Sequence, residues 1–186
     1  MTLLSFIASQ FSQSAKALKR TQTLTTVGIL LAIQMLLSSF GVFQLTESVK
    51  ISLAHLAVAP TAILFGPVAA GIQGALSDFL GYLLRPSGPY FPGFTLTALL
   101  LGVVYGMLFF KTKRSLWQII LARVLICVFI NIGLNTIFLA MLYGPAQWAA
   151  LPLRAMKNVL QLPIDCILLA AVCRAVARIP VRPTYR

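Results

Sequence analysis

The sequence predicts an all-α integral membrane protein, and three observations support this fold class. Of the 186 residues, 59% are hydrophobic and 10% are charged, whereas a soluble domain carries roughly a quarter charged residues. Acids are few, with only Glu47, Asp78 and Asp165 in the chain. Apolar stretches of about the length that crosses a bilayer recur along nearly the whole sequence and leave no room for a soluble domain. We therefore expect residues 1–186 to form a single membrane domain.

Residues 1–23 precede the first expected span. They lack the early positive charge and the small-residue cleavage site of a signal peptide, so we expect them to remain in the mature protein. Leu4, Ile7, Phe11 and Leu18 fall near helical spacing, which predicts a helix along the inner membrane surface. A frayed cytoplasmic tail is the alternative.

Residues 24–178 are expected to form a bundle of six membrane-spanning helices. The second span is short, contains Pro60 and meets the third at Gly66–Pro67, so this pair is expected to form a tight hairpin. Short or broken membrane helices often border a binding cavity. The expected spans are about Leu24–Phe43, Ile51–Phe65, Pro67–Leu84, Phe94–Phe110, Leu116–Tyr143 and Asn158–Ala177.

The basic residues indicate the orientation of these spans. If the amino terminus is cytoplasmic, Lys50, Arg85, Arg154 and Lys157 lie outside, and Arg123 lies within the fifth span. The basic residues then inside are Lys16, Lys19, Arg20, Lys111, Lys113, Arg114, Arg174, Arg178, Arg182 and Arg186. This inside bias predicts cytoplasmic termini, with residues 179–186 as an inner tail. Because the cations cluster at span ends instead of along one polar face, membrane topology explains the net charge of +12 better than nucleic acid binding.

The segment Arg85–Thr95, between the third and fourth spans, is predicted to be a stiff, non-helical external loop. Its three prolines fix φ and disfavour helix. Tyr90, Phe91 and Phe94 are then presented with little freedom left to lose on binding, which favours recognition of a flat ligand. This reasoning makes Tyr90, Phe91 and Phe94 candidate binding residues.

Catalytic, metal-binding and nucleotide-binding functions find little support in the sequence. Gly88 and Gly93 are spaced as in part of a phosphate loop, but Phe94 stands in place of the lysine, and Pro89 and Pro92 remove backbone N–H donors. The three cysteines lie in apolar stretches without CxxC spacing, and His55 is the single histidine. We therefore expect neither an enzyme nor a metal or cofactor site.

External cations are candidate partners for an anionic ligand. Arg85, Arg154 and Lys157 lie outside in the expected topology, with Glu47 as the one nearby acid. A site partly screened from water would strengthen their charge-assisted hydrogen bonds. The alternative is that they anchor helix ends to lipid phosphates.

Polar residues inside the spans have both binding and structural interpretations. Asn158 and Gln161 lie one turn apart before Pro163 and form a polar edge that could bind a heterocycle, although hydrogen bonds between helices are nearly as good an explanation. For Asn131 and Asn135 we favour the structural role. Asp78 and Asp165 are costly in a bilayer, and we expect salt bridges or hydrogen bonds for them in preference to a proton relay.

Small residues four apart predict close approach of helices. Gly28 and Ala32, in the first span, are the best candidates for an outward strip that docks another membrane protein.

Several motifs together resemble the S components of energy-coupling factor (ECF) transporters, and most closely the folate-specific S component. The most specific is Gly88–Thr95 (GPYFPGFT), which lies between Ser77–Tyr82 (SDFLGY) and Phe94–Ala98 (FTLTA). The likeness extends over nearly the whole chain, with six expected spans and the pattern Lys157-Asn158-x4-Pro163 at the start of the last one.

The resemblance implies a bacterial plasma membrane subunit that captures folate outside the cell for an ABC importer with a T component and two ATPases. In that family the first-span strip contacts the T component; Gly28 departs from the usual alanine, whereas Ala32 matches it. The family's site implies roles for Gln44–Ser52, Arg85–Thr95, the end of the fifth span and Asn158. Through this resemblance Gly93 and Thr95 join the candidate binding residues. An S component for another heterocyclic vitamin or precursor, a proton-coupled carrier and a ligand-free structural subunit are the alternatives.

Overall fold

Helices form most of the computed structural model of the protein, which describes residues 3–40, 42–46, 49–52, 54–86, 89–112 and 115–178. The elements are α1 (Leu3–Leu18), α2 (Thr21–Phe40), β1 (Val42–Thr46), β2 (Val49–Ser52), 3₁₀-helical η1 (Ala54–Ala57), α3 (Val58–Phe65), α4 (Pro67–Leu84), α5 (Pro92–Phe109), α6 (Leu116–Leu125), π-helical η2 (Ile126–Leu134), α7 (Asn135–Tyr143), 3₁₀-helical η3 (Pro145–Ala150) and α8 (Leu151–Arg178).

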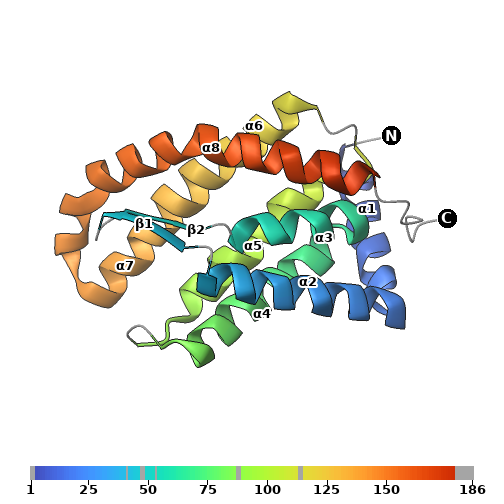
Figure 1. The fold of residues 1–186 in the computed structure, drawn as a ribbon, viewed down its shortest axis with the longest axis horizontal. Coiled ribbons are helices and arrows are strands. Elements are labelled where there is room, and N and C mark those ends of the chain that lie inside the picture. Colours follow the sequence, from blue (N-terminus) through green and yellow to red (C-terminus); the bar gives the residue numbers. More distant parts are fainter. Residues whose placement is uncertain are drawn as a thin grey trace.

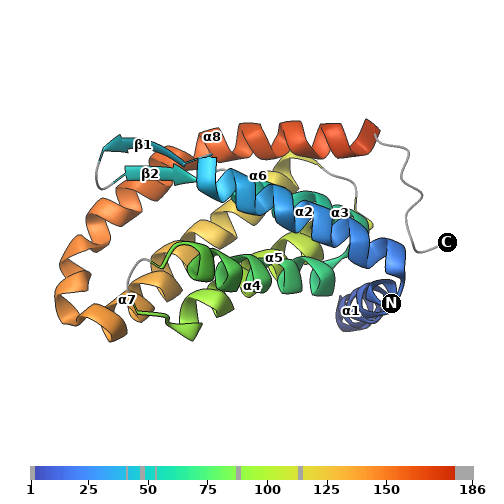
Figure 2. The same ribbon diagram turned by 60° about the horizontal axis from the view of Figure 1, so that its bottom comes forward.

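The long helices run side by side along the length of the molecule (Figures 1 and 2). Within the described part of the chain, four helices are long and apolar enough to cross a membrane: Thr21–Ser39, Pro92–Phe109, Leu116–Tyr143 and Pro145–Arg178. The predicted all-α class is confirmed, apart from a two-stranded hairpin, and the protein is a multi-pass membrane protein. The second expected span is short, as predicted, because α3 has eight residues and follows η1.

Close contact between α4 and α5 depends on glycine. A Cβ atom on Gly102 would collide with the carbonyl group of Ala70, and one on Gly106 would collide with the backbone of Pro67. The absence of side chains at these positions lets the two backbones approach closely, as in other membrane helix pairs. The helix pair then packs with α3 against the core, where Tyr105 and Phe109 are completely buried.

Helix α1 lies across one end of the bundle and satisfies backbone groups at the break between α3 and α4. Gly66 separates these helices with a φ of +87°. The Ser14 hydroxyl donates to the carbonyl of Phe65 at 2.6 Å and accepts from the backbone N–H of Val68 at 3.0 Å and of Ala69 at 3.2 Å. Ser14 thus acts as an N-cap for α4 from another helix. The expected helical pattern of the first residues is therefore present.

Two expected span boundaries are wrong. The first span was expected to reach Phe43 and the second to begin at Ile51, but α2 ends at Phe40 and β1 pairs with β2 in antiparallel fashion. The register pairs Val42 with Ser52 and Phe43 with Ile51. β-Branched and aromatic residues favour strands, and each strand satisfies the backbone groups of the other. Within the Gln44–Ser52 segment, residues 47 and 48 lie outside the described part of the chain.

The last helix also begins earlier than expected. It was expected to start at Asn158, but α8 starts at Leu151, directly after η3. Pro152 stands in its first turn, where a missing N–H leaves no helical bond unmade. As a result, Arg154 and Lys157 lie within the helix and not in a preceding loop.

Candidate functional site

A cavity lies between α8, η2–α7, α5 and η1, and we call it the Arg154 cavity. It has a volume of about 580 Å³, which falls within the range of small-molecule sites. Five of the residues predicted from the sequence line it. Its lining consists of His55, Phe94, Leu101, Arg123, Asn131, Asn135, Leu139, Ala150, Leu153, Arg154, Lys157, Asn158 and Gln161.

One face of α8 supplies four polar side chains to this cavity. Arg154, Lys157, Asn158 and Gln161 are spaced at i, i+3, i+4 and i+7, which places them along a single helical stripe. The Arg154 guanidinium donates to the side-chain oxygen of Gln147. Its Nη1 atom is buried and finds no hydrogen-bond acceptor among the described residues. An anionic ligand in the cavity could supply that acceptor.

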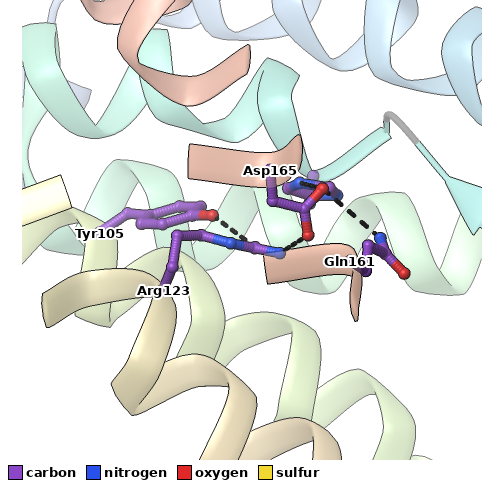
Figure 3. Close-up of polar contacts among 5 residues, drawn as sticks. Tyr105, Arg123, Gln161 and Asp165 are labelled. Carbon is purple, nitrogen blue, oxygen red and sulfur yellow. Dashed lines mark hydrogen bonds and ion pairs between the residues drawn. The ribbon is translucent and has the colours of Figure 1, made fainter. Parts of the chain in front are cut away.

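A buried ion pair between Arg123 and Asp165 lies beside the cavity (Figure 3). Asp165 of α8 is completely buried and binds the Arg123 guanidinium, whose other Nη atom donates to the Tyr105 hydroxyl at 2.9 Å. The second Asp165 oxygen lies 3.4 Å from His55 Nε2 and 3.5 Å from Gln161 Nε2. The prediction of a salt bridge for Asp165 is confirmed. Because His55, Arg123 and Gln161 all line the cavity, one carboxylate positions groups from three elements.

A second cavity lies beside the segment before α5, and we call it the Arg85 cavity. Its volume is about 440 Å³. Phe94 and Leu139 line both cavities, so these two side chains form the boundary between them. The lining consists of Ser38, Ser77, Asp78, Gly81, Tyr82, Arg85, Pro89, Tyr90, Phe91, Phe94, Leu139, Leu142 and Tyr143.

The two cavities divide the cations that were expected to act together. Arg85 lines the second cavity, and its guanidinium donates to the backbone carbonyl of Ser39 at 3.3 Å. Arg154 and Lys157 line the first cavity. The structure therefore does not gather Arg85, Arg154 and Lys157 in one cluster.

A hydrogen-bonded chain connects Tyr90 to Asp78. The Thr95 hydroxyl donates to Asp78 Oδ2 at 2.7 Å and lies 2.8 Å from the Tyr90 hydroxyl, which donates to it. The Tyr90 ring also packs against the Tyr82 ring, with centroids 5.1 Å apart. The predicted hydrogen-bonding role of Asp78 is confirmed, and Tyr90 is fixed by contacts from α4 and α5.

The predicted non-helical segment is shorter than expected. Helix α5 begins at Pro92, because proline at the first helical position is favourable, so Gly93, Phe94 and Thr95 belong to the first turn. A Cβ atom on Gly93 would lie 2.8 Å from the Phe138 ring, so glycine makes room for aromatic packing there. In the described part of the chain, neither Gly93 nor Thr95 lines either cavity. Residues 87 and 88 lie outside that part.

Two polar residues that line the Arg154 cavity, His55 and Arg123, were not among the expected site residues, and Asn131 and Asn135, for which a structural role was favoured, line it as well. The cost of an arginine inside an apolar stretch was a signal for Arg123. Asn131 lies in the π-helical segment, and such segments are frequent at functional sites. No group of three or more metal-ligating side chains occurs among the described residues.

Gly28 and Ala32 lie on an uncovered face of α2. Both residues are exposed, and no atom within the described structure lies within 4 Å of a Cβ atom built on Gly28. Exposed hydrophobic side chains flank them, including Ile29 at 58% and Leu36 at 59% exposure. This face is open to lipid or to another membrane protein.

Comparison with known proteins gives consistent matches. The model of the ECF transporter, substrate-specific component family matches residues 22–174. The folate transporter FolT of Clostridium novyi (strain NT) is 33% identical over 164 residues, which cover 88% of this chain and 95% of the relative. The folate transporter FolT of Leuconostoc mesenteroides is 32% identical over 151 residues, or 78% of this chain and 80% of the relative.

A solved structure supports the same relationship. The crystal structure of FolT bound with folic acid matches with a TM-score of 0.76 and 34% sequence identity. The match covers 88% of this chain and 97% of the solved chain. Sequence and fold therefore agree over nearly the whole molecule.

Proposed function

The chain belongs to the family of ECF transporter substrate-specific components, and from this premise we propose that it captures folate at the outer face of the cell membrane. The observation that carries the proposal is the Arg154 cavity, whose lining combines three cations, four side-chain amides and the aromatic ring of Phe94. Folate has a flat heterocycle at one end and two carboxylates at the other. The similarity to FolT chains, one of them solved with folic acid, selects this ligand among vitamins.

The charge of the Arg154 cavity suits the folate dianion. Its lining cations are Arg123, Arg154 and Lys157, and the Asp165 carboxylate neutralises Arg123. The remaining charge of about two positive units is matched by two carboxylates in a partly water-excluded site. Asn158 and Gln161 then offer amide groups to the polar parts of the ligand.

We further propose that the chain acts with a T component and two ATPases as an ABC importer. The family implies this partnership. The chain itself provides the ligand cavity and an open helix face on α2 where a partner could dock. Gly28 and Ala32 would dock the T component, since small side chains let a partner helix approach closely. Six spans are inferred from α2, α3, α4, α5, the continuous Leu116–Tyr143 helix and α8, with both termini in the cytoplasm.

Fluorescence titration tests folate capture. Trp148 lies in η3, two residues from the cavity-lining Ala150, whereas Trp117 lies in the first turn of α6. We expect folic acid to quench the emission of the purified chain. The quench should disappear in Trp148→Phe and persist in the matched control Trp117→Phe. Micromolar folic acid without any quench or thermal stabilisation would argue strongly against the proposal.

Co-purification tests the partnership. Gly28→Leu fills the open strip and should remove the T component from the purified complex while folic acid binding is retained. Gly28→Ala, which has the usual residue of the family, is the matched control and should retain the partner. If both variants retain the T component, this strip is not part of the docking surface. Folate uptake without the ATPases would instead favour a stand-alone carrier.

A further inference from the structure

A groove runs between α6 and the second half of α8, which pack against each other (Figure 1). It consists of two adjoining hollows of about 170 and 360 Å³, which share Leu116, Ile119, Ala170 and Arg174. None of these four residues lines the Arg154 cavity or the Arg85 cavity. We call it the α6–α8 groove. Isoleucine, alanine and cysteine make up the rest of its lining, so apart from Arg174 the groove is apolar.

Small side chains on α8 shape this groove. Cys166, Ala170 and Ala177 line it at helical spacing. The lining side chains of Leu116 and Ile167 are larger and are 60% and 71% exposed. A flexible acyl chain can follow such a groove and make dispersion contacts along it. The shape and the apolar lining therefore suit a hydrocarbon chain of the bilayer.

Arg174 has no acidic partner among the described residues. The chain has 15 lysines and arginines but only three acids, and Glu47 lies outside the described part. Asp165 forms its ion pair with Arg123, and Asp78 accepts a hydrogen bond from Thr95. A guanidinium without a carboxylate partner suits a phosphate, which it can bind through two parallel hydrogen bonds.

The charged end of the groove lies near a membrane surface. Trp117, in the first turn of α6, is 79% exposed, and tryptophan concentrates at membrane–water interfaces. Its neighbour Leu116 lines the groove together with Arg174, which lies one turn before the last residue of α8. Cys166, eight residues earlier on α8, lies about 12 Å deeper along the helix axis. Headgroup and acyl chain chemistry thus follow each other in the order found in a phospholipid.

We propose that the α6–α8 groove binds an anionic phospholipid, with its phosphate on Arg174 and an acyl chain along α8 toward Cys166. Arg178, exposed one turn further along α8, adds positive charge at the headgroup end. Anionic lipids are attracted to such basic groups at the membrane surface. A zwitterionic lipid brings its own cation, which finds no free carboxylate here among the described residues. This site is separate from folate capture and does not depend on it.

Thermal unfolding of the purified chain in detergent tests the site. Dioleoyl-phosphatidylglycerol is the anionic probe, and dioleoyl-phosphatidylcholine is the control with the same acyl chains. We expect phosphatidylglycerol to raise the unfolding temperature by roughly 5–10 °C at saturation, and phosphatidylcholine by less than half as much. Arg174→Gln should lose most of the difference between the lipids. Arg20→Gln is the matched control and should keep it, because Arg20 is also exposed but does not line the groove.

A second variant and a second measurement test the apolar part. Ala170→Leu keeps Arg174 but fills the groove where its two hollows meet, and should also lose the response to phosphatidylglycerol. Native mass spectrometry then measures the retained lipid directly. We expect the unaltered chain and Arg20→Gln to retain one phosphatidylglycerol, and Arg174→Gln to retain it at least fivefold less often.

Four results would overturn the proposal. The first is equal stabilisation of the unaltered chain by both lipids. The second is a full phosphatidylglycerol response in both Arg174→Gln and Ala170→Leu. The third is the same stabilisation by inorganic phosphate, which has no acyl chain. The fourth is loss of the T component from the purified complex of either variant while its lipid response is unchanged, which would assign the groove to a protein partner.

Discussion

Asp165→Asn removes the negative charge that compensates Arg123 while keeping the size of the side chain. Asp165 is completely buried and Arg123 is 6% exposed, so water cannot replace the lost partner. Breaking a buried ion pair by removing one charge costs about 3–5 kcal/mol. For a chain of this length, each kcal/mol lowers the unfolding temperature by about 2–4 °C. We therefore expect a decrease of roughly 6–20 °C.

The assay is thermal unfolding of the purified protein in detergent, with a double-mutant cycle as its control. Arg123→Met combined with Asp165→Asn removes both charges and should recover a large part of the loss, since an apolar replacement of a buried pair is often nearly neutral. Two results would refute the reasoning. One is an Asp165→Asn variant that unfolds within about 1 °C of the unaltered chain. The other is a double variant whose loss equals the sum of the single losses.

Three further substitutions test the packing and the site. Gly102→Ala should lower the free energy of unfolding by about 1–3 kcal/mol, because the new Cβ meets the Ala70 carbonyl, whereas Gly28→Ala should be tolerated; equal effects would contradict the close packing of α4 and α5. Ser14→Ala should cost about 0.5–2 kcal/mol through the lost cap of α4, measured by chemical or thermal unfolding, and an unchanged stability would exclude that role. Asn158→Ala should weaken folic acid binding more than tenfold in a binding titration at unchanged thermal stability, and an unaltered affinity would remove this residue from the site.

The helical architecture was predictable because long apolar stretches signal membrane helices directly. The hairpin was not, since a short strand beside a helix end offers only a few alternating residues, and Val42–Thr46 reads equally well as the last turn of α2. The start of α8 was not predicted, because Pro152 followed by the cations Arg154 and Lys157 is a pattern that also occurs in loops. In the structure they form an ordinary first helical turn and a polar face.

The candidate site was predictable where it depends on one helix. Arg154, Lys157, Asn158 and Gln161 share a stripe whose spacing is visible in the sequence. The contact of His55 with Asp165 joins residues more than a hundred positions apart, and no local period reveals such a pairing. The same limit explains why the position of Arg85 was not predicted. The expected topology put Arg85 and Arg154 on the same side of the membrane, but the fold places Arg85 in the neighbouring cavity.

Saturation binding of radiolabelled folic acid to the purified chain, without any partner subunit, tests the central claim most directly. The account predicts saturable binding of one folic acid per chain, which excess unlabelled folic acid displaces and excess thiamine or riboflavin does not. Displacement by another vitamin but not by folic acid would contradict the folate assignment. Absence of saturable binding at micromolar folic acid would contradict the claim that this chain is the subunit that captures folate.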